Sequence, residues 1–326
     1  MSDACRPDSF EGFVGQEKQK RVLQILCQSA KKKGTCPPHV LLSGPPGLGK
    51  TTLARIVANE MGSRLVEIVA GNIQGPDDVI KHLTGIRKND VLFADEIHGM
   101  ARSTEEIFYS AMEDGRIPVV QGGYDQLLKS LGMASPKQTV EMRELPPFTM
   151  IGATTLSGLV SDPLRSRFVQ ILQLDPYSDL ELQTIILKAS TNMKFDIPPV
   201  VAMEIAMRSR STARTAIGNL KWFAEFCEGT GVAPNLAAIG EAFELKNVDA
   251  HGLNKLDRSY LSVLVEAGMP LGISTLASSI GEGEDNLLQT IEPFLIRKGY
   301  VCKTGRGRIA TAKAVELING KEAANA

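Results

Sequence analysis

The sequence predicts an α/β core built around a phosphate-binding loop, then a small helical domain, and last a winged-helix domain. Three observations support this prediction. Up to about residue 177, short apolar strands alternate with amphipathic helices, and a glycine-rich loop follows the first strand. From residue 178 helices follow one another, and the last segment combines helices with a glycine-tipped hairpin. The 326 residues exceed one ordinary core, so we expect domains at 1–177, 178–247 and 248–326.

The segment His39–Ala54 is the clearest functional signal. Val40–Leu42 is a short apolar strand, and Gly44–Thr51 fills every defined position of the phosphate-loop pattern G-x-x-x-x-G-K-[ST]. Glycines let backbone N–H groups converge on phosphate oxygens, and the following helix adds its positive end. Lys50 is expected on the β- and γ-phosphates and the Thr51 hydroxyl on Mg²⁺. The alternative, a plain Gly/Pro turn, leaves this complete match unexplained.

An acidic pair ends the apolar strand Val91–Glu96. Beside a phosphate loop, Asp95 is expected to orient the Mg²⁺ shell and Glu96 to polarise the attacking water. The alternative is a strand-to-helix N-cap. His98 follows closely, but no second His or Cys lies at metal-ligand spacing, so we assign it to packing or coupling.

Two further groups of residues stay ambiguous from spacing alone. The strand Thr149–Ala153 is followed by two threonines, and Thr155 either reaches the γ-phosphate and catalytic water or is simply a good strand residue. Arg165 and Arg167 lie on a short segment after this strand. They form either surface salt bridges or arginine fingers that reach a neighbour's γ-phosphate.

The helical domain is expected to act as a lid over the nucleotide. Arg214 lies at the start of one of its helices and can reach back to the phosphates. The helices are predicted at Asp179–Ser190, Pro198–Ser209, Arg214–Glu228 and Leu236–Phe243.

The last segment predicts a winged helix, with helices at Leu256–Val265, Ile273–Ile280 and Asp285–Arg297 and a hairpin over Gly299–Ala310. Five Lys and Arg lie between Arg297 and Arg308, with no acid among them. This pattern favours contacts with the DNA backbone that position without reading sequence. The alternatives are a wing that binds protein and a hairpin that is merely soluble.

Composition narrows the function classes. With 36 basic and 37 acidic residues the chain is not basic throughout, so any nucleic-acid contact depends on a local patch. The five cysteines show no paired spacing, which fits reduced thiols. The sequence shows neither a signal-peptide pattern nor an apolar run of about 18 residues, so we expect a soluble, cytoplasmic protein.

Several motifs together resemble the RuvB family, the AAA+ ATPases that drive branch migration of Holliday junctions. They are Gly44–Thr52, Asp95–His98, Leu145–Thr149, Gly152–Thr155, Pro163–Phe168 and Thr304–Arg308. The resemblance extends from about Arg6 to Leu317. It implies a homo-hexameric ring around DNA, with ATP and Mg²⁺ held between subunits.

The resemblance also implies roles for individual residues. Glu96 and Lys50 would be catalytic, Thr155 the polar sensor, and Arg167 the arginine finger with Arg165 as its substitute. The wing would contact DNA through Lys303, Arg306 and Arg308. The nucleotide site would comprise Arg6, Phe13, Val14, Gly47, Gly49, Lys50, Thr51, Thr52, Asp95, Glu113, Asp114, Tyr177 and Arg214.

The chain departs from the family pattern at three places. Ser211–Arg214 keeps the lid arginine but lacks the usual Gly and Pro, and Lys303–Gly305 replaces Arg-Thr-Pro in the wing. The hairpin Pro118–Glu144, through which the family docks a RuvA-like junction-binding protein, is longer and contains a helix-like stretch, Tyr124–Leu131. Two other functions stay open: a clamp-loader-type AAA+ switch and a DNA-binding regulator controlled by ATP.

Overall fold

The computed structural model describes residues 6–121 and 139–322. The chain divides into two compact units, which meet in the sequence between Tyr177 and Ser178. Residues 178–326 form one unit, so the further division at 247/248 stays a prediction. The helix predicted at Tyr124–Leu131 lies outside the described residues.

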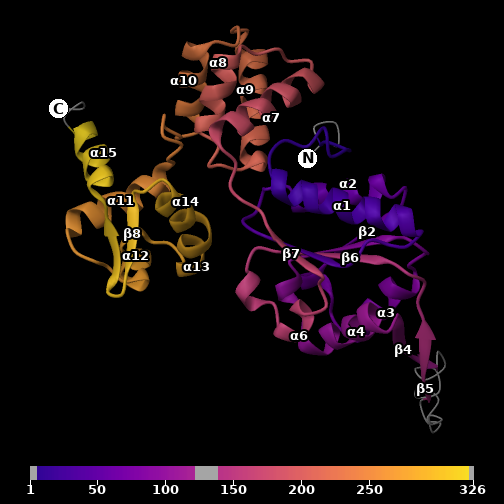
Figure 1. Ribbon diagram of the computed structural model, residues 1–326. Coiled ribbons are helices and arrows are strands. Elements are labelled where there is room, and N and C mark those ends of the chain that lie inside the picture. Colours follow the sequence, from indigo (N-terminus) through magenta and orange to yellow (C-terminus); the bar gives the residue numbers. More distant parts are fainter. Residues whose placement is uncertain (1–5, 122–138, 323–326) are drawn as a thin grey trace, which may run out of the picture. The chain divides into compact units, whose positions relative to one another are not determined.

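A five-stranded parallel sheet forms the centre of the first unit, which confirms the predicted α/β core (Figure 1). The strand order is β2-β3-β6-β1-β7. All residues of β1 and β6 are buried, as expected of parallel strands covered on both faces. The strands are β1 (Val40–Ser43), β2 (Leu65–Val69), β3 (Val91–Asp95), β6 (Thr149–Thr154) and β7 (Gln170–Gln173).

Helices cover both faces of this sheet (Figure 1). On one side lie α1 (Glu17–Lys33) and α2 (Lys50–Glu60); on the other lie α3 (Pro76–Thr84), α4 (Arg102–Glu113) and the short α6 (Asp162–Arg165). Helix α2 begins at Lys50, directly after Gly49. Lys50 and Thr51 therefore lie in its first turn, directly after the glycine-rich loop.

The Pro118–Glu144 region begins and ends in an antiparallel arm outside the main sheet (Figure 1). Strand β4 (Arg116–Gln121) pairs with β5 (Thr139–Glu144), and Arg116 lies opposite Glu144. These two side chains form an ion pair of 3.1 Å at the base of the arm.

The second unit begins with a helical bundle, formed by α7 (Asp179–Asn192), α8 (Pro199–Met207), α9 (Ala213–Thr230) and α10 (Leu236–Leu245). Ser178 and Glu181 form a capping box at the start of α7. The Trp222 indole donates to the carbonyl of Ala242 at 2.8 Å, and the neighbouring Phe223 is fully buried. The four bundle helices agree with those predicted from the sequence, with ends that differ by at most two residues.

The winged-helix segment differs from the prediction in one of its expected helices. The helix expected at Asp285–Arg297 is interrupted by a π turn over Leu287–Ile291. Pro293 explains the interruption, since it has no N–H to donate to the carbonyl four residues earlier. The elements are α11 (Lys255–Ala267), α12 (Ile273–Ile280), α13 (Glu284–Asn286), α14 (Glu292–Arg297), β8 (Val301–Thr304), β9 (Gly307–Ala310) and α15 (Ala312–Glu322).

Helix α15 was not predicted from the sequence. Ala314, Leu317 and Ile318 recur at helical spacing and pack against the winged-helix core. This spacing is the signal that identifies the helix, so the hairpin is followed by a further helix.

Within the described residues, no helix combines the length and apolar character required to cross a bilayer.

Candidate functional site

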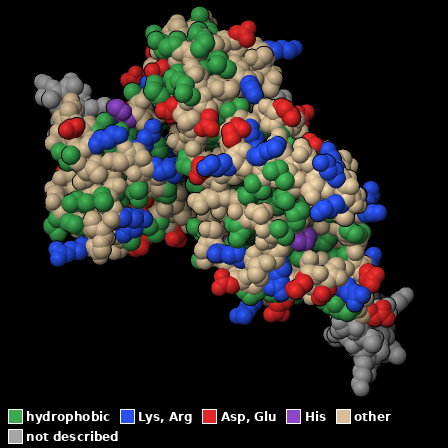
Figure 2. Space-filling view, in the orientation of Figure 1, with side chains coloured by type: hydrophobic (Ala, Val, Ile, Leu, Met, Phe, Trp, Pro, Cys, Tyr) green, Lys and Arg blue, Asp and Glu red, His purple; other side chains and the backbone are tan. Residues whose placement is uncertain are grey.

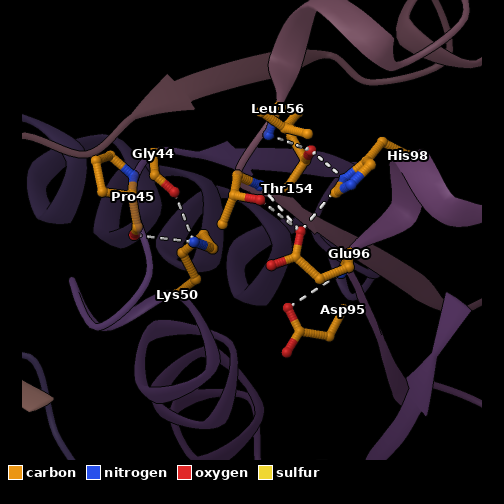
Figure 3. Close-up of polar contacts among 9 residues, drawn as sticks. Gly44, Pro45, Lys50, Asp95, Glu96, His98, Thr154 and Leu156 are labelled. Carbon is orange, nitrogen blue, oxygen red and sulfur yellow. Dashed lines mark hydrogen bonds and ion pairs between the residues drawn. The ribbon is translucent and has the colours of Figure 1, made fainter. Parts of the chain in front are cut away.

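The phosphate loop follows the C-terminal end of β1. Gly47 and Gly49 have φ values of 82° and 101°, a conformation that glycine adopts without strain. Lys50 is buried, and its Nζ donates to the carbonyls of Gly44 at 2.7 Å and Pro45 at 3.1 Å (Figure 3). No side chain caps α2, and its first turn contains no acid. The loop therefore suits a polyphosphate, whose oxygens can bind the backbone N–H groups at the start of α2.

Two aromatic residues predicted at the nucleotide pack against this loop. A Cβ placed on Gly49 would lie 2.8 Å from Cζ of Phe13 and 3.5 Å from the hydroxyl oxygen of Tyr177. The Tyr177 hydroxyl also donates to the carbonyl of Leu48 at 3.0 Å. The fold thus brings residues from both ends of the first unit to the phosphate loop, and a side chain at Gly49 would collide with the Phe13 ring.

Gln16, which the sequence analysis did not select, joins the same two ends. Its side-chain amide donates to the carbonyl of Asp175 at 2.6 Å and accepts from the backbone N–H of Asp175 at 3.0 Å. Gln16 itself has a φ of 54° and is buried. It fixes the segment containing Phe13 and Val14 beside the segment that leads to Tyr177.

The acidic pair and the predicted sensor meet at one edge of the sheet, since β3 and β6 are parallel neighbours. Asp95 ends β3, and Glu96 leaves the strand with a φ of 49°. One Glu96 carboxylate oxygen accepts from the backbone N–H and the hydroxyl of Thr155, at 3.1 and 3.0 Å. In Figure 3, Lys50, Asp95 and Glu96 project into the same region.

His98 also belongs to this group, a contact that the sequence analysis did not assign. A 3₁₀ turn over Ile97–Gly99 returns the chain, so His98 Nδ1 lies 3.3 Å from the bonded Glu96 oxygen. The same nitrogen lies 3.0 Å from the hydroxyl oxygen of buried Thr154 (Figure 3). Thr155 therefore hydrogen-bonds to the Glu96 carboxylate, and His98 contacts the same oxygen.

Arg167 lies at the opposite edge of the sheet. The carbonyl of His39, just before β1, accepts from the backbone N–H of Val169, just before β7. Arg167 therefore precedes the strands, whereas the phosphate loop follows them. The four residues of β1 separate these edges by ~13 Å.

Side chains at this edge fix the orientation of Arg167. Its guanidinium donates to Glu113 at 2.8 Å and lies 4.8 Å from the ring centroid of Tyr109. The ring hydroxyl donates to the buried Glu105 at 2.7 Å, and burial raises the pKa of Tyr109. Arg165 donates to the carbonyl of Ser157. Of the two alternatives for these arginines, a surface salt bridge or an arginine finger, the single chain shows the salt bridge of Arg167 with Glu113. Glu113, predicted at the nucleotide, therefore lies beside Arg167.

The remaining predicted nucleotide residues are placed individually. Arg6, the first described residue, is half-buried. Thr51 and Thr52 are half-buried in α2. Asp114 is exposed at the end of α4. Arg214 is an exposed residue in the first turn of α9 and belongs to the second unit.

The predicted DNA-binding wing is tied to a buried acid. Glu292 is fully buried at the start of α14. Its oxygens lie 2.6 Å from Lys303 Nζ and 2.7 Å from Arg308 Nε, and it accepts from the Tyr260 hydroxyl at 2.9 Å. Burial raises the pKa of Glu292, but these hydrogen bonds outweigh it and leave the pKa below its ordinary value. The resulting stabilisation is present at neutral pH and is lost as the pH falls through this lowered pKa.

The three wing cations therefore differ in their surroundings. The Arg308 side chain is only 16% exposed, whereas that of Lys303 is 49% exposed. Arg306 is exposed at the turn of the hairpin. On the face shown in Figure 2, basic and acidic side chains are interspersed, in line with the near-neutral chain.

Comparison with known proteins identifies the family. The model for the Holliday junction DNA helicase RuvB P-loop domain matches residues 5–174, and the RuvB C-terminal winged-helix model matches residues 250–319. The chain belongs to the RuvB family. A RuvB from Corynebacterium diphtheriae is 42% identical over 317 residues, 96% of this chain and 84% of that protein. One from Campylobacter curvus is 40% identical over 320 residues, 98% of this chain and 91% of that protein.

Solved RuvB structures agree with the sequence relatives. The Thermotoga maritima RuvB Holliday junction branch migration motor matches with a TM-score of 0.83 and 37% identity, covering 97% of this chain and 99% of that chain. The resemblance deduced from the motifs, together with the P-loop AAA+ core and the winged helix, is therefore confirmed. Individual site assignments stay predictions.

Replacing His98 by Ala tests its contact with Glu96. Because His98 orients the carboxylate without replacing it, we expect ATP turnover to fall by about ten- to a hundredfold, with nucleotide binding retained. His82→Ala, on the exposed side of α3, is the matched control. Unchanged turnover in His98→Ala would leave the histidine only a packing role.

Replacing Arg308 by Ala separates structural from DNA-binding roles in the wing. Glu292 would keep Lys303 but lose its main partner. We therefore expect the free energy of unfolding of the second unit to fall by about 2–3 kcal/mol, less than for a fully unpaired buried charge. Arg306→Ala should leave stability within about 0.5 kcal/mol but reduce the salt dependence of DNA binding by about one phosphate contact. Chemical unfolding measures the free energy of unfolding, and DNA binding at several salt concentrations measures the salt dependence. Equal stability of the two variants would contradict the structural role of Arg308.

Proposed function

We propose that this chain is an ATP-driven motor that moves Holliday junctions. The names of its RuvB relatives state this activity, branch migration of Holliday junctions. The observation that carries the proposal is the oriented Glu96 beside the phosphate loop, in a chain that also contains a winged helix. ATP hydrolysis is the chemistry that a P-loop with this acidic pair performs.

Each residue of the site has a defined task in this proposal. Lys50 and the N–H groups of the loop bind the β- and γ-phosphates, and Thr51 and Asp95 would hold Mg²⁺. Bound there, Mg²⁺ would supply positive charge against the polyphosphate. Glu96 orients and polarises the attacking water, and Thr155 and His98 keep its carboxylate in position. The half-buried Thr51 and the uncapped start of α2 support this arrangement.

Arg167 serves the nucleotide of a neighbouring subunit. Its position at the opposite edge of the sheet from its own phosphate loop supports action between subunits. A closed ring in which each copy offers Arg167 and Glu113 to the next would repeat this interface, and a homo-hexamer is the form that the family implies. Breaking the exposed Arg167–Glu113 pair costs little, so Arg167 can exchange this carboxylate for a phosphoryl group.

The DNA and partner contacts complete the proposal. Arg306 and Lys303 contact the DNA backbone, and Arg308 positions the hairpin through Glu292. The antiparallel arm of β4 and β5 docks a RuvA-like junction-binding protein, supported by its projection from the main sheet (Figure 1). The protein acts on DNA in the cytoplasm.

A synthetic four-way junction tests the motor directly. With ATP, Mg²⁺ and a RuvA-like partner, we expect strand exchange by the wild type, and Glu96→Gln should reduce turnover by at least about a hundredfold because the water loses its base. Glu106→Gln, an exposed acid on α4, should stay active. ATP turnover without junction movement would favour a clamp-loader-type switch, and undiminished turnover in Glu96→Gln would refute the catalytic assignment.

Mixing two inactive variants tests the shared site. Glu96→Gln and Arg167→Ala should each be inactive alone, because each removes one half of every interface. Mixed rings contain interfaces with an intact Glu96 on one subunit and an intact Arg167 on the next, on the order of a quarter for random assembly. We expect ATP turnover to return on mixing, and a mixture as inactive as its components would contradict action between subunits.

A further inference from the structure

The loop between α8 and α9 has an unusual backbone. Arg210 and Ser211 have φ values of 54° and 59°, so two consecutive residues with a Cβ adopt the left-handed conformation. Each such residue costs energy and persists only where the surroundings determine it. The side-chain contacts of Arg210 supply this determination.

The Arg210 guanidinium leaves the helical bundle and binds the winged-helix segment at three points. Its two terminal nitrogens donate to the two carboxylate oxygens of Asp257, at 3.2 and 3.0 Å. One of them also donates to the carbonyl of Thr290, at 3.1 Å. The group lies 4.4 Å from the ring centroid of Phe294. These partners belong to α11, the π turn and α14, so one side chain joins the bundle to three elements.

The burial of Asp257 makes this contact costly to break. Its side chain is fully buried, and it also accepts from the backbone N–H of Asn254 at 2.9 Å in the capping box of α11. Burial raises the pKa of Asp257, and the charge of Arg210 opposes this rise. Without Arg210, an acid that caps α11 would be left buried without its cation.

The elements beyond Arg210 carry the residues with predicted functions. On the bundle side, Thr212 caps α9 by accepting from the N–H of Thr215, and the first turn of this helix contains Arg214. On the winged-helix side, the π turn leads directly into Glu292, which holds both Lys303 and Arg308. Arg210 therefore lies between the predicted nucleotide contact and the predicted DNA contact of the same unit.

We propose that Arg210 is a positioning residue that couples the helical bundle to the winged helix, so that displacement of the start of α9 is passed to the wing. This inference rests on the proposed function. A bidentate, stacked guanidinium suits the task because its planar fork fixes both distance and orientation, which a lysine ammonium does not.

The test compares Arg210→Gln with Arg208→Gln. Arg208 is a close match, because it pairs with Glu204 and lies 5.4 Å from the ring centroid of Phe243, but both partners are within the bundle. We expect Arg210→Gln to keep basal ATP turnover and duplex affinity. It should lose about fivefold or more of the stimulation of turnover by DNA, and of junction movement per ATP hydrolysed. Arg208→Gln should keep both.

A second variant guards against misfolding. Arg210→Lys keeps a cation beside Asp257 but cannot also reach Thr290 with the same geometry, so it should fold and still show reduced coupling. Wild-type stimulation and movement in both Arg210 variants would overturn the proposal.

Calorimetric unfolding provides a readout that does not depend on ATP. In the wild type we expect the bundle and winged helix to unfold in one transition, and in Arg210→Gln in two, with Arg208→Gln behaving as the wild type. If the wild type hydrolyses no ATP, the proposed function fails and the number of transitions alone decides the coupling. One shared transition in Arg210→Gln would then refute it.

Discussion

The parallel register of β3, β6 and β1 is the constraint on which the site depends. Since these strands run in the same direction, their carboxyl ends place the phosphate loop, the Asp95–Glu96 pair and Thr154–Thr155 at one edge of the sheet. The parallel pairing of β1 with β7 places Arg167, and with it Glu113, at the other edge. One topological feature thus separates the groups proposed to hold a nucleotide from those proposed to act on a neighbouring subunit. No local change of side chain could reverse this separation.

The sequence alone was sufficient to predict a functional site where its residues are contiguous in the chain. Gly44–Thr51 needs a fixed order of backbone N–H groups and one lysine, so the motif is complete in the chain itself. His98 could not be assigned in this way, because its contact with Glu96 depends on the 3₁₀ turn between them and on Thr154 from another strand. Gln16 is similar, since its partner Asp175 lies far away in the sequence. Hydrogen bonds between distant segments leave no periodic signal.

The wing shows how a local charge count can mislead. The stretch from Arg297 to Arg308 contains no acid, yet Glu292, just before it, neutralises part of its charge. The interaction could not be read from spacing, because the start of α14 returns to the hairpin only in the folded domain. Pro293 was a visible sign that the preceding helix is irregular, and the π turn follows from it. The apolar spacing of Ala314, Leu317 and Ile318, by contrast, is visible in the sequence and is typical of a helix such as α15.

Three arginines in this chain make the same pair of contacts. Two of them, Arg167 and Arg210, differ in how exposed the partner carboxylate is. Arg167, Arg208 and Arg210 each stack on an aromatic ring and bind a carboxylate. The Glu113 partner of Arg167 is 62% exposed, whereas the Asp257 partner of Arg210 is fully buried. An exposed carboxylate is rehydrated at little cost when its arginine leaves, but a buried one cannot be. Arg167 is thus oriented by a contact that is cheap to exchange, as its proposed role between subunits requires, while Arg210 is held by one that is costly to break.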